Sequence, residues 1–458
     1  MRTTVLRRQL RGRVVEPHQP GYERARQIWN GAIDKRPAVI AYCLDTADVA
    51  TALRFGREHD LPIAVRAGGH GVAGKCLPAD GLVIDVRGLA ELAIDPATQI
   101  ARAGAGLLNG ELDAAAGRLG LATTAGIVSH TGLAGLALGG GIGWLARRFG
   151  ATCDNLTGAA VVTADGVVRE AAADADLRWA LTGAGANFGI VTRLDLAVHE
   201  IGQRVLAGVL TFGAESAGDV LAGYAELAAV APPELGTIVS LRHAPPAAWL
   251  PPELHGRPVV LIGVCWTGAT QERLDQLLAP LRARRPLADS IALVRYADHQ
   301  QIFDGGVPHG LRYHWRSGYV ADLADQTISR LTSDAWSMRN RRSYTIMFQL
   351  GGALARPDPD ATAFGGRHGF AVNINAVWDS TESDDVAWVN ASWEALRPSS
   401  AGVYVNFLDD EPADRVRAAY SPAAYRRLVQ VKRRYDPDNV FRANHNIDPA
   451  VSPAQLVP

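Results

Sequence analysis

The sequence predicts an α+β protein in which two kinds of sheet occupy successive parts of the chain. Up to about residue 202, short apolar strands alternate with helical patterns and end in glycine-rich turns. Asp165-Gly166 between two apolar runs indicates an antiparallel hairpin, so this first sheet is expected to be mixed rather than purely parallel. From about residue 203, long apolar strands alternate with helical runs and the glycine-rich turns stop. A second domain built on another sheet is therefore expected there.

The first elements follow one another closely. Residues 38–42 form a short apolar strand, and Asp45 or Thr46 can cap the helix that follows. Strands are expected at 61–65 and 81–86, with a glycine turn between them. This pattern predicts a compact α+β unit rather than an array of repeats.

The later elements are predicted from apolar runs and cap signals. The hairpin joins 160–163 to 167–169, and Ser421-Pro422 is a good helix start whose helix ends before Pro437. In between, the sequence predicts strands at 205–212, 259–266 and 344–350 and a helix at 271–284.

Composition excludes several classes of function. A chain of 458 residues that is 48% hydrophobic has room for two or three well-filled domains. Lys plus Arg number 46 against 47 Asp plus Glu, so no bulk charge attracts nucleic acid or a membrane surface. No apolar run resembles a signal segment or a membrane span, and we expect a soluble, cytoplasmic monomer or homodimer acting on a small molecule. The four cysteines have no metal or disulfide spacing and are expected to be reduced: Cys43, Cys76, Cys153 and Cys265.

Two separated glycine-rich stretches carry the chemical signal. The first, 66–71, follows a strand and contains His70; the second runs from 126 to 132 and on into 139–143. Glycine lets a backbone approach a phosphate closely and point its amides at it. A large phosphate-bearing cofactor is therefore indicated. The triple glycine 139–141 does not fit a Rossmann motif, because 133–138 before it has helical rather than strand spacing, and NAD(P) is not expected.

These motifs resemble those of the berberine bridge enzyme-like FAD-linked oxidases of the vanillyl-alcohol oxidase superfamily. The resemblance spans nearly the whole chain in order. It is carried by R-A-G-G-H-G-V-A-G (66–74), G-I-V-S-H-T-G-L-A-G-L-A-L-G-G-G-I-G-W-L (126–145), D-N-L (154–156), V-V-T-A-D-G (161–166), N-F-G-I-V-T (187–192), Y-V-N-F (404–407) and Y-D-P-D-N-V-F-R-A-N-H-N-I (435–447). It implies a two-part PCMH-type FAD-binding domain, 1–202 and 401–458, around an inserted substrate domain, 203–400, whose antiparallel sheet is backed by helices.

The resemblance also implies a cofactor site. His70 matches the histidine that is bonded to the 8α carbon of the flavin, whereas the second tether of some members, a cysteine, is replaced here by Val128, so a single covalent bond to FAD is expected. His445 is expected either at the flavin edge or in a surface turn, and His309 in a structural turn. The other expected cofactor contacts are Arg66, Ala67, Gly68, Gly69, Gly71, Gly126, His130, Thr131, Gly132, Gly135, Gly140, Gly141, Gly143, Gly189, Ile190, Asn444 and Asn446.

The resemblance makes Tyr404 the catalytic base, with Asn406 as its orienting partner. If 404–406 is a strand, both side chains point to one face. A tyrosine base needs hydrogen bonds or positive charge near its oxygen. Polar residues that could face the substrate are Tyr313, Trp315, Gln349, Asn373 and Asn375, each of which could equally be an ordinary sheet residue.

The implied activity is oxidation of a CH-OH or CH-NH group by FAD, with molecular oxygen as acceptor and hydrogen peroxide as product. The substrate would be a small sugar, alkaloid or other compound of secondary metabolism. Two alternatives stay open at this point: a dehydrogenase that uses another acceptor, and a flavin-binding protein without activity.

Overall fold

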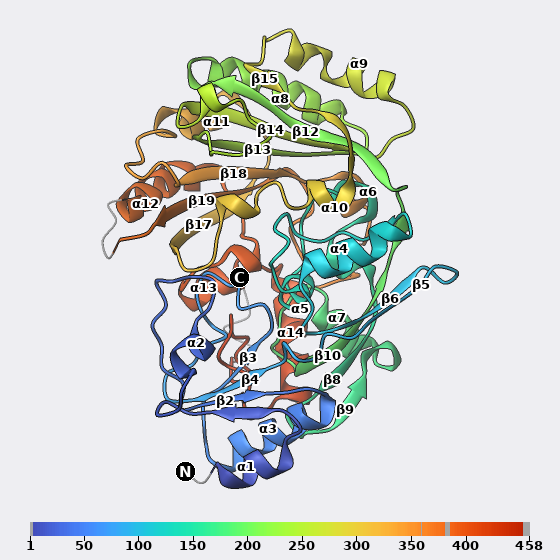
Figure 1. Cartoon of the computed structure of the whole chain (residues 1–458), viewed down its shortest axis with the longest axis vertical. Coiled ribbons are helices and arrows are strands. Elements are labelled where there is room, and N and C mark those ends of the chain that lie inside the picture. Colours follow the sequence, from blue (N-terminus) through green and yellow to red (C-terminus); the bar gives the residue numbers. More distant parts are fainter. Residues whose placement is uncertain (1–2, 359, 381–384, 452–458) are drawn as a thin grey trace.

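The chain folds into two sheet-based halves that meet at a central cavity (Figure 1). The computed structural model describes residues 3–358, 360–380 and 385–451. The half that holds the N-terminus contains a mixed four-stranded sheet, β1-β2-β4-β3, and an antiparallel five-stranded sheet, β5-β6-β10-β8-β9. Its strands are β1 Arg13–Val15, β2 Val39–Tyr42, β3 Ile63–Arg66, β4 Leu82–Asp85, β5 Leu92–Asp95, β6 Ile100–Gly104, β7 Leu121–Ala122, β8 Leu156–Val162, β9 Val168–Glu170, β10 Ile190–Ala197 and β11 His199–Glu200, and its helices are α1 Thr4–Gln9, α2 Tyr22–Arg26, α3 Thr46–Glu58, α4 Asn109–Arg118, α5 Leu133–Leu138, α6 Ala146–Phe149 and α7 Ala175–Leu181.

Local signals place these elements as the sequence predicts. Asp45 caps α3 by accepting a hydrogen bond from the Asp48 backbone N–H, and β2 pairs in parallel with β4. The Asp165-Gly166 turn joins β8 and β9 as an antiparallel pair, with Gly166 at φ +80°. The prediction of a mixed first sheet is confirmed.

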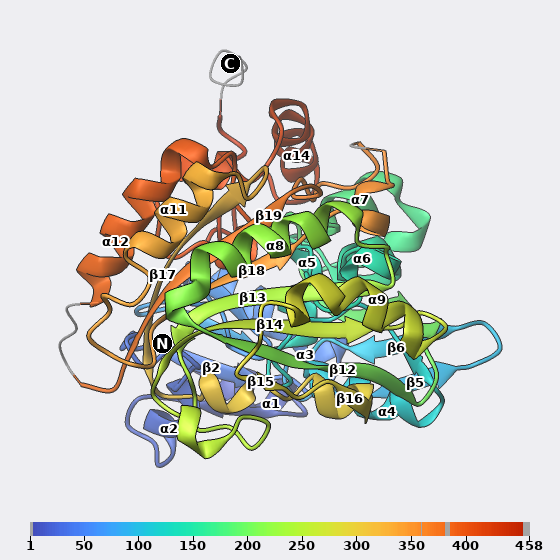
Figure 2. The same ribbon diagram turned by 90° about the horizontal axis from the view of Figure 1, so that it is seen from above.

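The other half is a single antiparallel sheet of eight strands with helices packed on its outer face (Figures 1 and 2). Its order is β15-β12-β14-β13-β18-β19-β17, with β16 pairing with β12. Helices α8, α9, α11 and α12 lie on the face away from the first half in both views. The bounds are β12 Arg204–Gly213, α8 Ala217–Val230, β13 Leu235–His243, β14 Pro258–Trp266, α9 Gln271–Arg282, β15 Ala288–Asp289, β16 Ala292–Arg295, α10 Tyr296–His299, β17 Arg312–Val320, α11 Asp325–Ser333, β18 Tyr344–Gln349, β19 Phe370–Trp378 and α12 Asp385–Leu396.

Both faces of the large sheet are buried at strands β18 and β19, and successive residues alternate between the two faces. On β18, Met347 packs in the helix-side core, whereas Ile346 and Phe348 pack in the core that faces the first half. On β19, Val372, Ile374 and Ala376 belong to the helix side. The intervening residues of β19, including both asparagines, therefore point toward the first half.

The C-terminal segment returns to the first half. Helices α13 Ala413–Arg417 and α14 Pro422–Tyr435 follow the large sheet, and Ser421 caps α14 by accepting from the Ala424 N–H. Leu428 and Val429 of α14 are fully buried in the same core as β2, β8 and β10. The two ends of the chain thus share one hydrophobic core.

One local prediction is wrong. Residues Val405–Phe407 form a short 3-10 helix that Tyr404 precedes, not a strand. In this part of the chain the segment packs between the two halves with no strand partner, and the backbone closes its own turn through a Phe407 N–H to Tyr404 C=O hydrogen bond of 2.9 Å. Within the described residues, every helix is too short or too polar to cross a bilayer.

Candidate active site

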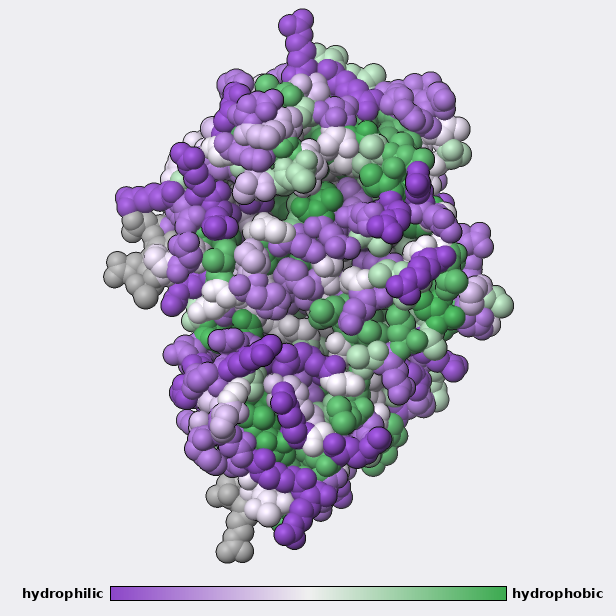
Figure 3. Space-filling model, viewed as in Figure 1, coloured by the Kyte–Doolittle hydropathy of each residue, from purple (hydrophilic) through white to green (hydrophobic). Residues whose placement is uncertain are grey.

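A cavity of about 340 Å³ lies where the glycine-rich turns, the large sheet and the C-terminal segment meet. The first half contributes Ala67 to Gly71 and parts of the second glycine stretch. The large sheet contributes β17, β18 and β19, and the C-terminal segment contributes 404–408 and 444–445. The face seen in the space-filling view carries both hydrophilic residues and several groups of hydrophobic ones (Figure 3). The cavity itself is mostly apolar.

The two glycine stretches touch each other. A Cβ at Gly68 would collide with the Gly132 backbone, and one at Gly132 would collide with that of Gly68. Gly69 has φ +67°, which glycine adopts without strain. Arg66 does not line the cavity: its buried guanidinium donates to the carbonyls of Ala25 and Gln27 and so braces the turn from behind. Both stretches also line the cavity, so the backbones of both can contact a bound group.

His70 lies on this wall with a free ring nitrogen. Its imidazole stacks on Trp29 at 4.3 Å between ring centroids, and Trp29 stacks on Tyr313 at 3.6 Å. The buried Nε2 has no hydrogen-bond partner among the residues that the structure describes. Burial, with His130 and His309 nearby, holds the pKa of His70 well below its ordinary value. His70 is therefore a neutral imidazole whose Nε2 makes no hydrogen bond to the described residues.

The second glycine stretch supports the same wall. Val128 lines the cavity, whereas His130 sits behind it with ring centroids 5.0 Å from His70 and 4.9 Å from His309. Ser129 is fixed by Asp304, which accepts from its backbone N–H at 2.9 Å and from its hydroxyl. His130 and His309 thus form the immediate surroundings of His70 rather than the cavity surface.

Tyr404 and Asn406 face the cavity together although they are not on a strand. The Tyr404 oxygen accepts hydrogen bonds from the Gly141 N–H at 2.7 Å and from Asn406 Nδ2 at 2.8 Å. Asn406 Nδ2 also donates to the Leu136 carbonyl at 3.0 Å, which fixes the amide. Burial raises the pKa of Tyr404 above its ordinary value, while the hydrogen bonds from Asn406 and Gly141 lower it. Two N–H donors on one phenol oxygen favour its ionised form.

The large sheet supplies the opposite wall, and residue parity decides which side chains reach it. Trp315 and Asn373 line the cavity together with Tyr344, Ile346 and Phe348. Gln349 points to the other face, where it accepts from Thr237 at 2.7 Å and donates to the Ala228 carbonyl at 2.8 Å. The Gln349 side chain therefore does not face the cavity, and the expectation that it contacts substrate is wrong.

Two further candidates on the sheet side stand behind the cavity wall. Tyr313 donates to the Pro308 carbonyl at 2.6 Å and stacks on Trp29. Asn375 donates to the Asn373 carbonyl at 2.9 Å, next to the wall. Both are placed to support cavity residues.

The C-terminal segment closes one end. Asn444 and His445 line the cavity, whereas Asn446 and Gly189 do not. Burial lowers the pKa of His445 to about 4, so this imidazole is neutral. Asn187 joins the segment to β10 by donating to the His445 carbonyl at 3.2 Å and accepting from the Ile447 N–H at 3.0 Å.

The remaining expected cofactor contacts divide by position. Ala67, Gly68, Gly69, Gly71, Gly126, Thr131, Gly132, Gly135 and Ile190 line the cavity, whereas Gly140, Gly141 and Gly143 form the backbone turn behind it. Gly143 is needed for packing, because a Cβ there would collide with the Ala125 carbonyl.

The residues present fit an FAD group. The paired glycine backbones leave the close approach that a pyrophosphate requires, and the orphaned His70 Nε2 is available for a bond. Among the residues of 3–358, 360–380 and 385–451, no cluster of His, Cys, Asp or Glu side chains could hold a metal ion. All four cysteines are free thiols.

Sequence reasoning missed several cavity residues. Trp29, Lys75 and Phe407 line the cavity, and Lys75 pairs with Asp410 at 2.5 Å. Trp29 lies on a loop far from either glycine stretch, and no local signal marks it. Lys75 follows the first glycine turn by only a few residues, which could have suggested it.

Comparisons with known proteins agree with this arrangement. Residues 37–172 match the family described as FAD binding domain, and residues 403–448 match the family described as berberine and berberine like. The chain is 30% identical to (R)-6-hydroxynicotine oxidase of Paenarthrobacter nicotinovorans, over 96% of this chain and 97% of that protein. It is also 30% identical to an uncharacterized FAD-linked oxidoreductase of Bacillus subtilis, over 96% of this chain and 97% of that protein.

Solved structures show the same fold. The crystal structure of 6-hydroxy-D-nicotine oxidase from Arthrobacter nicotinovorans has a TM-score of 0.86 and 28% identity, covering 96% of this chain and 98% of that one. Xylooligosaccharide oxidase from Myceliophthora thermophila has a TM-score of 0.85 at 20% identity, covering 99% and 100%.

Proposed function

Because the chain belongs to the berberine bridge enzyme-like FAD-linked oxidoreductases, we propose that it is an oxidase that removes two hydrogens from a CH-OH or CH-NH group of a small neutral molecule. Residues 1–202 and 401–458 would bind FAD, and residues 203–400 would carry the substrate wall. The observation that carries the proposal is the pairing, on one cavity, of His70 with a free nitrogen and Tyr404 with a doubly hydrogen-bonded oxygen.

The residues divide the work in a simple way. Tyr404 accepts the proton of the substrate hydroxyl or amine at its oxygen, and the N–H groups of Asn406 and Gly141 stabilise negative charge on that oxygen. When bound, FAD supplies the acceptor for the hydride that leaves the substrate carbon. The electron pair and both protons end on oxygen: the alcohol plus O₂ gives the carbonyl compound plus H₂O₂.

The charge of the cavity supports an uncharged substrate. Apart from the histidines, Lys75 is the one charged side chain among the described residues that line the cavity. The ion pair with Asp410 compensates the charge of Lys75. No carboxylate lines the described cavity to receive an ammonium group. Trp315, Phe348 and Phe407 offer flat apolar surfaces, which suit a ring-containing molecule.

The test is a screen of neutral and cationic alcohols and amines for hydrogen peroxide release. Peroxide formed in proportion to substrate consumed is the expected result. Reduction of the flavin by a substrate without peroxide in air would instead identify a dehydrogenase. A flavin that no compound reduces would leave only a binding role.

We expect FAD to remain attached to His70 after denaturation. The neutral imidazole and its orphaned Nε2 are the physical reason. Acid precipitation should leave a yellow pellet, and mass spectrometry should find one FAD on the peptide that contains His70. His70→Ala should keep some FAD through the glycine loops but release it into the acid supernatant. Complete release from the wild-type protein would contradict covalent attachment.

We also expect only one covalent bond to the flavin. Val128 lines the cavity at the position where some members of the family have a cysteine. Its isopropyl group cannot form a thioether. Cys76 also lines the cavity, but burial raises the pKa of its thiol and keeps it protonated. Peptide mapping should therefore show no flavin on cysteine. A native thioether to Cys76 would overturn this expectation.

A further inference from the structure

The Gly140-Gly141 turn is held in place by a neighbouring loop. Gly140 and Gly141 have φ +124° and +86°, a backbone path that favours glycine. The Cys153 N–H donates to the Gly140 carbonyl at 2.8 Å, and the Thr152 N–H donates to the Gly141 carbonyl at 2.9 Å. These bonds fix both peptide groups that flank Gly141. The Gly141 N–H is thereby aimed at the Tyr404 oxygen.

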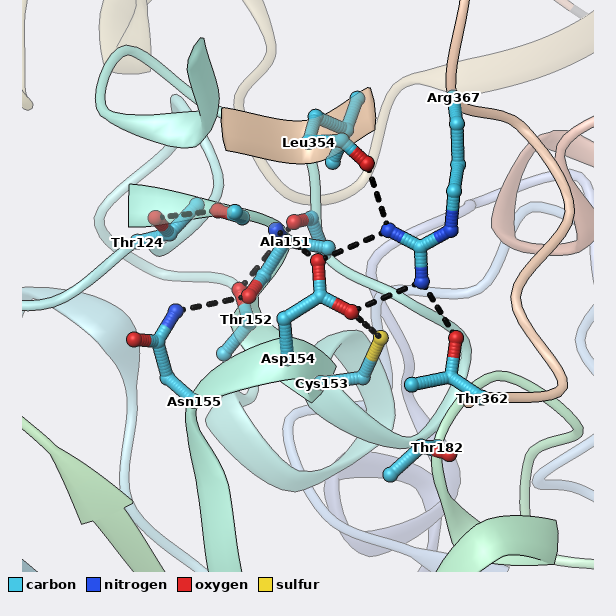
Figure 4. A network of polar contacts seen from close by, with 12 residues as sticks. Thr124, Ala151, Thr152, Cys153, Asp154, Asn155, Thr182, Leu354, Thr362 and Arg367 are labelled. Atoms are coloured by element: carbon cyan, nitrogen blue, oxygen red, sulfur yellow. Dashed lines mark hydrogen bonds and ion pairs between the residues drawn. The ribbon is translucent and has the colours of Figure 1, made fainter. Parts of the chain in front are cut away.

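Asp154 anchors that loop to the other half of the molecule (Figure 4). One carboxylate oxygen accepts from the Ala151 N–H at 2.8 Å, and the carboxylate pairs with both terminal nitrogens of Arg367 at 2.9 and 3.0 Å. Arg367 precedes β19 and also donates to the Leu354 carbonyl at 2.7 Å and to the Thr362 hydroxyl. The two side chains are only 9% and 6% exposed. A buried bidentate pair of this kind fixes geometry strongly.

Arg367 reaches Tyr404 by a second route. Its guanidinium lies over the Phe364 ring at 5.3 Å, and Phe364 meets the Tyr404 ring edge to face at 5.8 Å. The Phe364 N–H donates to the Thr182 carbonyl at 3.0 Å, so the ring is held from both sides. Two independent chains of contacts from one arginine therefore converge on the same tyrosine.

Neither member of the pair lines the cavity, so the pair would not contact a bound substrate directly. The other titratable groups that face the Tyr404 oxygen are the Cys153 thiol and the Tyr319 phenol, both buried and neutral. Asp154 and Arg367 compensate each other's charge. The contribution of the pair is thus positional rather than a direct field.

We propose that the Asp154–Arg367 ion pair is a positioning element for catalysis, which holds the Gly141 N–H against the Tyr404 oxygen and so sets how readily Tyr404 accepts the substrate proton. The proposal rests on Tyr404 as the base. It assigns a reaction role to a pair that links the FAD-binding half to the substrate-binding half.

The pair is tested by the pH dependence of flavin reduction. Weakening a hydrogen bond to an ionised oxygen disfavours the ionised form. The pKa of the limb, which is the pH range over which the rate of flavin reduction increases with pH, should therefore rise. We expect an upward shift of about one unit, and a rate about tenfold lower at a pH below the limb, in Asp154→Asn and Arg367→Gln holoenzymes. Arg367→Lys keeps the charge without the bidentate geometry and should shift the limb less; it also serves if Arg367→Gln does not fold.

Two controls separate this role from loss of structure. Arg147 is another buried arginine that joins the two halves, donating to the carbonyls of Leu235, Leu350 and Ala231, but it does not touch the Gly140-Gly141 turn through its side chain. Arg147→Gln should lower stability and leave the limb at its wild-type pH. In a Tyr404→Phe background, Arg367→Lys should cause no further loss of rate.

The outcomes distinguish the two proposals. A limb that stays at the wild-type pH in all three pair variants, but disappears in Tyr404→Phe, would overturn the positioning role and leave Tyr404 as the base. A limb that persists in Tyr404→Phe would overturn the base assignment itself. An equal shift of the limb in Arg147→Gln would show that the pair contributes only to general packing and does not position Tyr404.

Discussion

Tyr404→Phe is expected to slow reduction of the flavin by roughly 100-fold or more while FAD loading stays normal, as loss of a general base typically does. The hydroxyl is the only part of the side chain that the change removes. The ring still packs edge to face on Phe364 and Phe407 at centroid distances of 5.8 and 4.7 Å. The cavity therefore keeps its shape while it loses the atom that takes the proton.

The pH dependence gives the sign of the effect. A tyrosine that serves as the base, as we propose for Tyr404, would act only when ionised, so reduction in the wild type should accelerate as pH rises through its pKa. Burial is the largest influence and raises this pKa above its ordinary value, and the hydrogen bonds from Asn406 and Gly141 offset part of that rise. In the Phe variant this alkaline limb should vanish. Anaerobic stopped-flow reduction with any accepted substrate measures both quantities.

A matched control is available in Tyr224. Its phenol is also fully buried but hydrogen-bonds Thr237 in the helix-side core of the large sheet, away from the cavity. Tyr224→Phe should leave the reduction rate and the limb unchanged. A Tyr404→Phe rate within about threefold of wild type, with the limb intact, would assign the base to another group.

Local features of this fold could be predicted from the sequence because local chemistry determines them. The Asp45 and Ser421 caps, the Asp165-Gly166 hairpin and the apolar runs of β12, β14 and β18 lie within a few residues of the predicted positions. The order of strands in the large sheet could not be predicted. β13 separates β14 from β18, and such a pairing depends on contacts between segments far apart in sequence.

The sheet wall shows a specific limit of sequence reasoning. Adjacent residues of a strand face opposite sides, so Phe348 and Gln349 could not both reach the cavity. The sequence alone does not say which one does, because both faces of β18 are buried. The structure answers through Met347, which packs with the helices and therefore carries Gln349 to the same side.

For Tyr404 and Asn406, the expected contact is present although the expected strand is not. The expected strand is a 3-10 turn, yet the Asn406 amide bonds the Tyr404 oxygen directly at 2.8 Å. The Gly141 N–H, more than 250 positions earlier in the chain, supplies the second donor. No sequence pattern connects Gly141 with Tyr404, and only the folded chain brings these two groups together.

The second large effect is expected at Lys432, which ties the C-terminal segment to the FAD-binding half. Lys432 on α14 and Asp436 at the end of that helix are fully buried, and the distance from Lys432 Nζ to Asp436 Oδ2 is 2.7 Å. The other two ammonium hydrogens go to the carbonyls of Asn187 at 2.8 Å and Phe441 at 2.9 Å. All three donors of the ammonium group are therefore used. Asn187 in turn fixes the segment that holds His445 on the cavity.

Lys432→Met is expected to lower the free energy of unfolding by about 3–5 kcal/mol, because it leaves the Asp436 carboxylate buried without its counter-charge. Asp436 still accepts from the Val440 and Phe441 N–H groups, so the charge has partners but no cation. The loss should also loosen FAD, since the Asn187 carbonyl and the 444–445 wall lose their common anchor. Denaturant unfolding followed by tryptophan fluorescence and by flavin release measures both.

The design of the controls decides whether the cause is the buried charge. Arg434 lies on the same helix, but its side chain is 61% exposed and its ion pair with Asp174 is long, at 3.6 Å. Arg434→Met should therefore lower the free energy of unfolding by less than about 1 kcal/mol. Adding Asp436→Asn to Lys432→Met removes the uncompensated carboxylate and should restore part of the stability. If Lys432→Met and Arg434→Met unfold at the same denaturant concentration, the buried pair contributes no more than a surface one, and the C-terminal segment must be held by its apolar contacts through Leu428 and Val429.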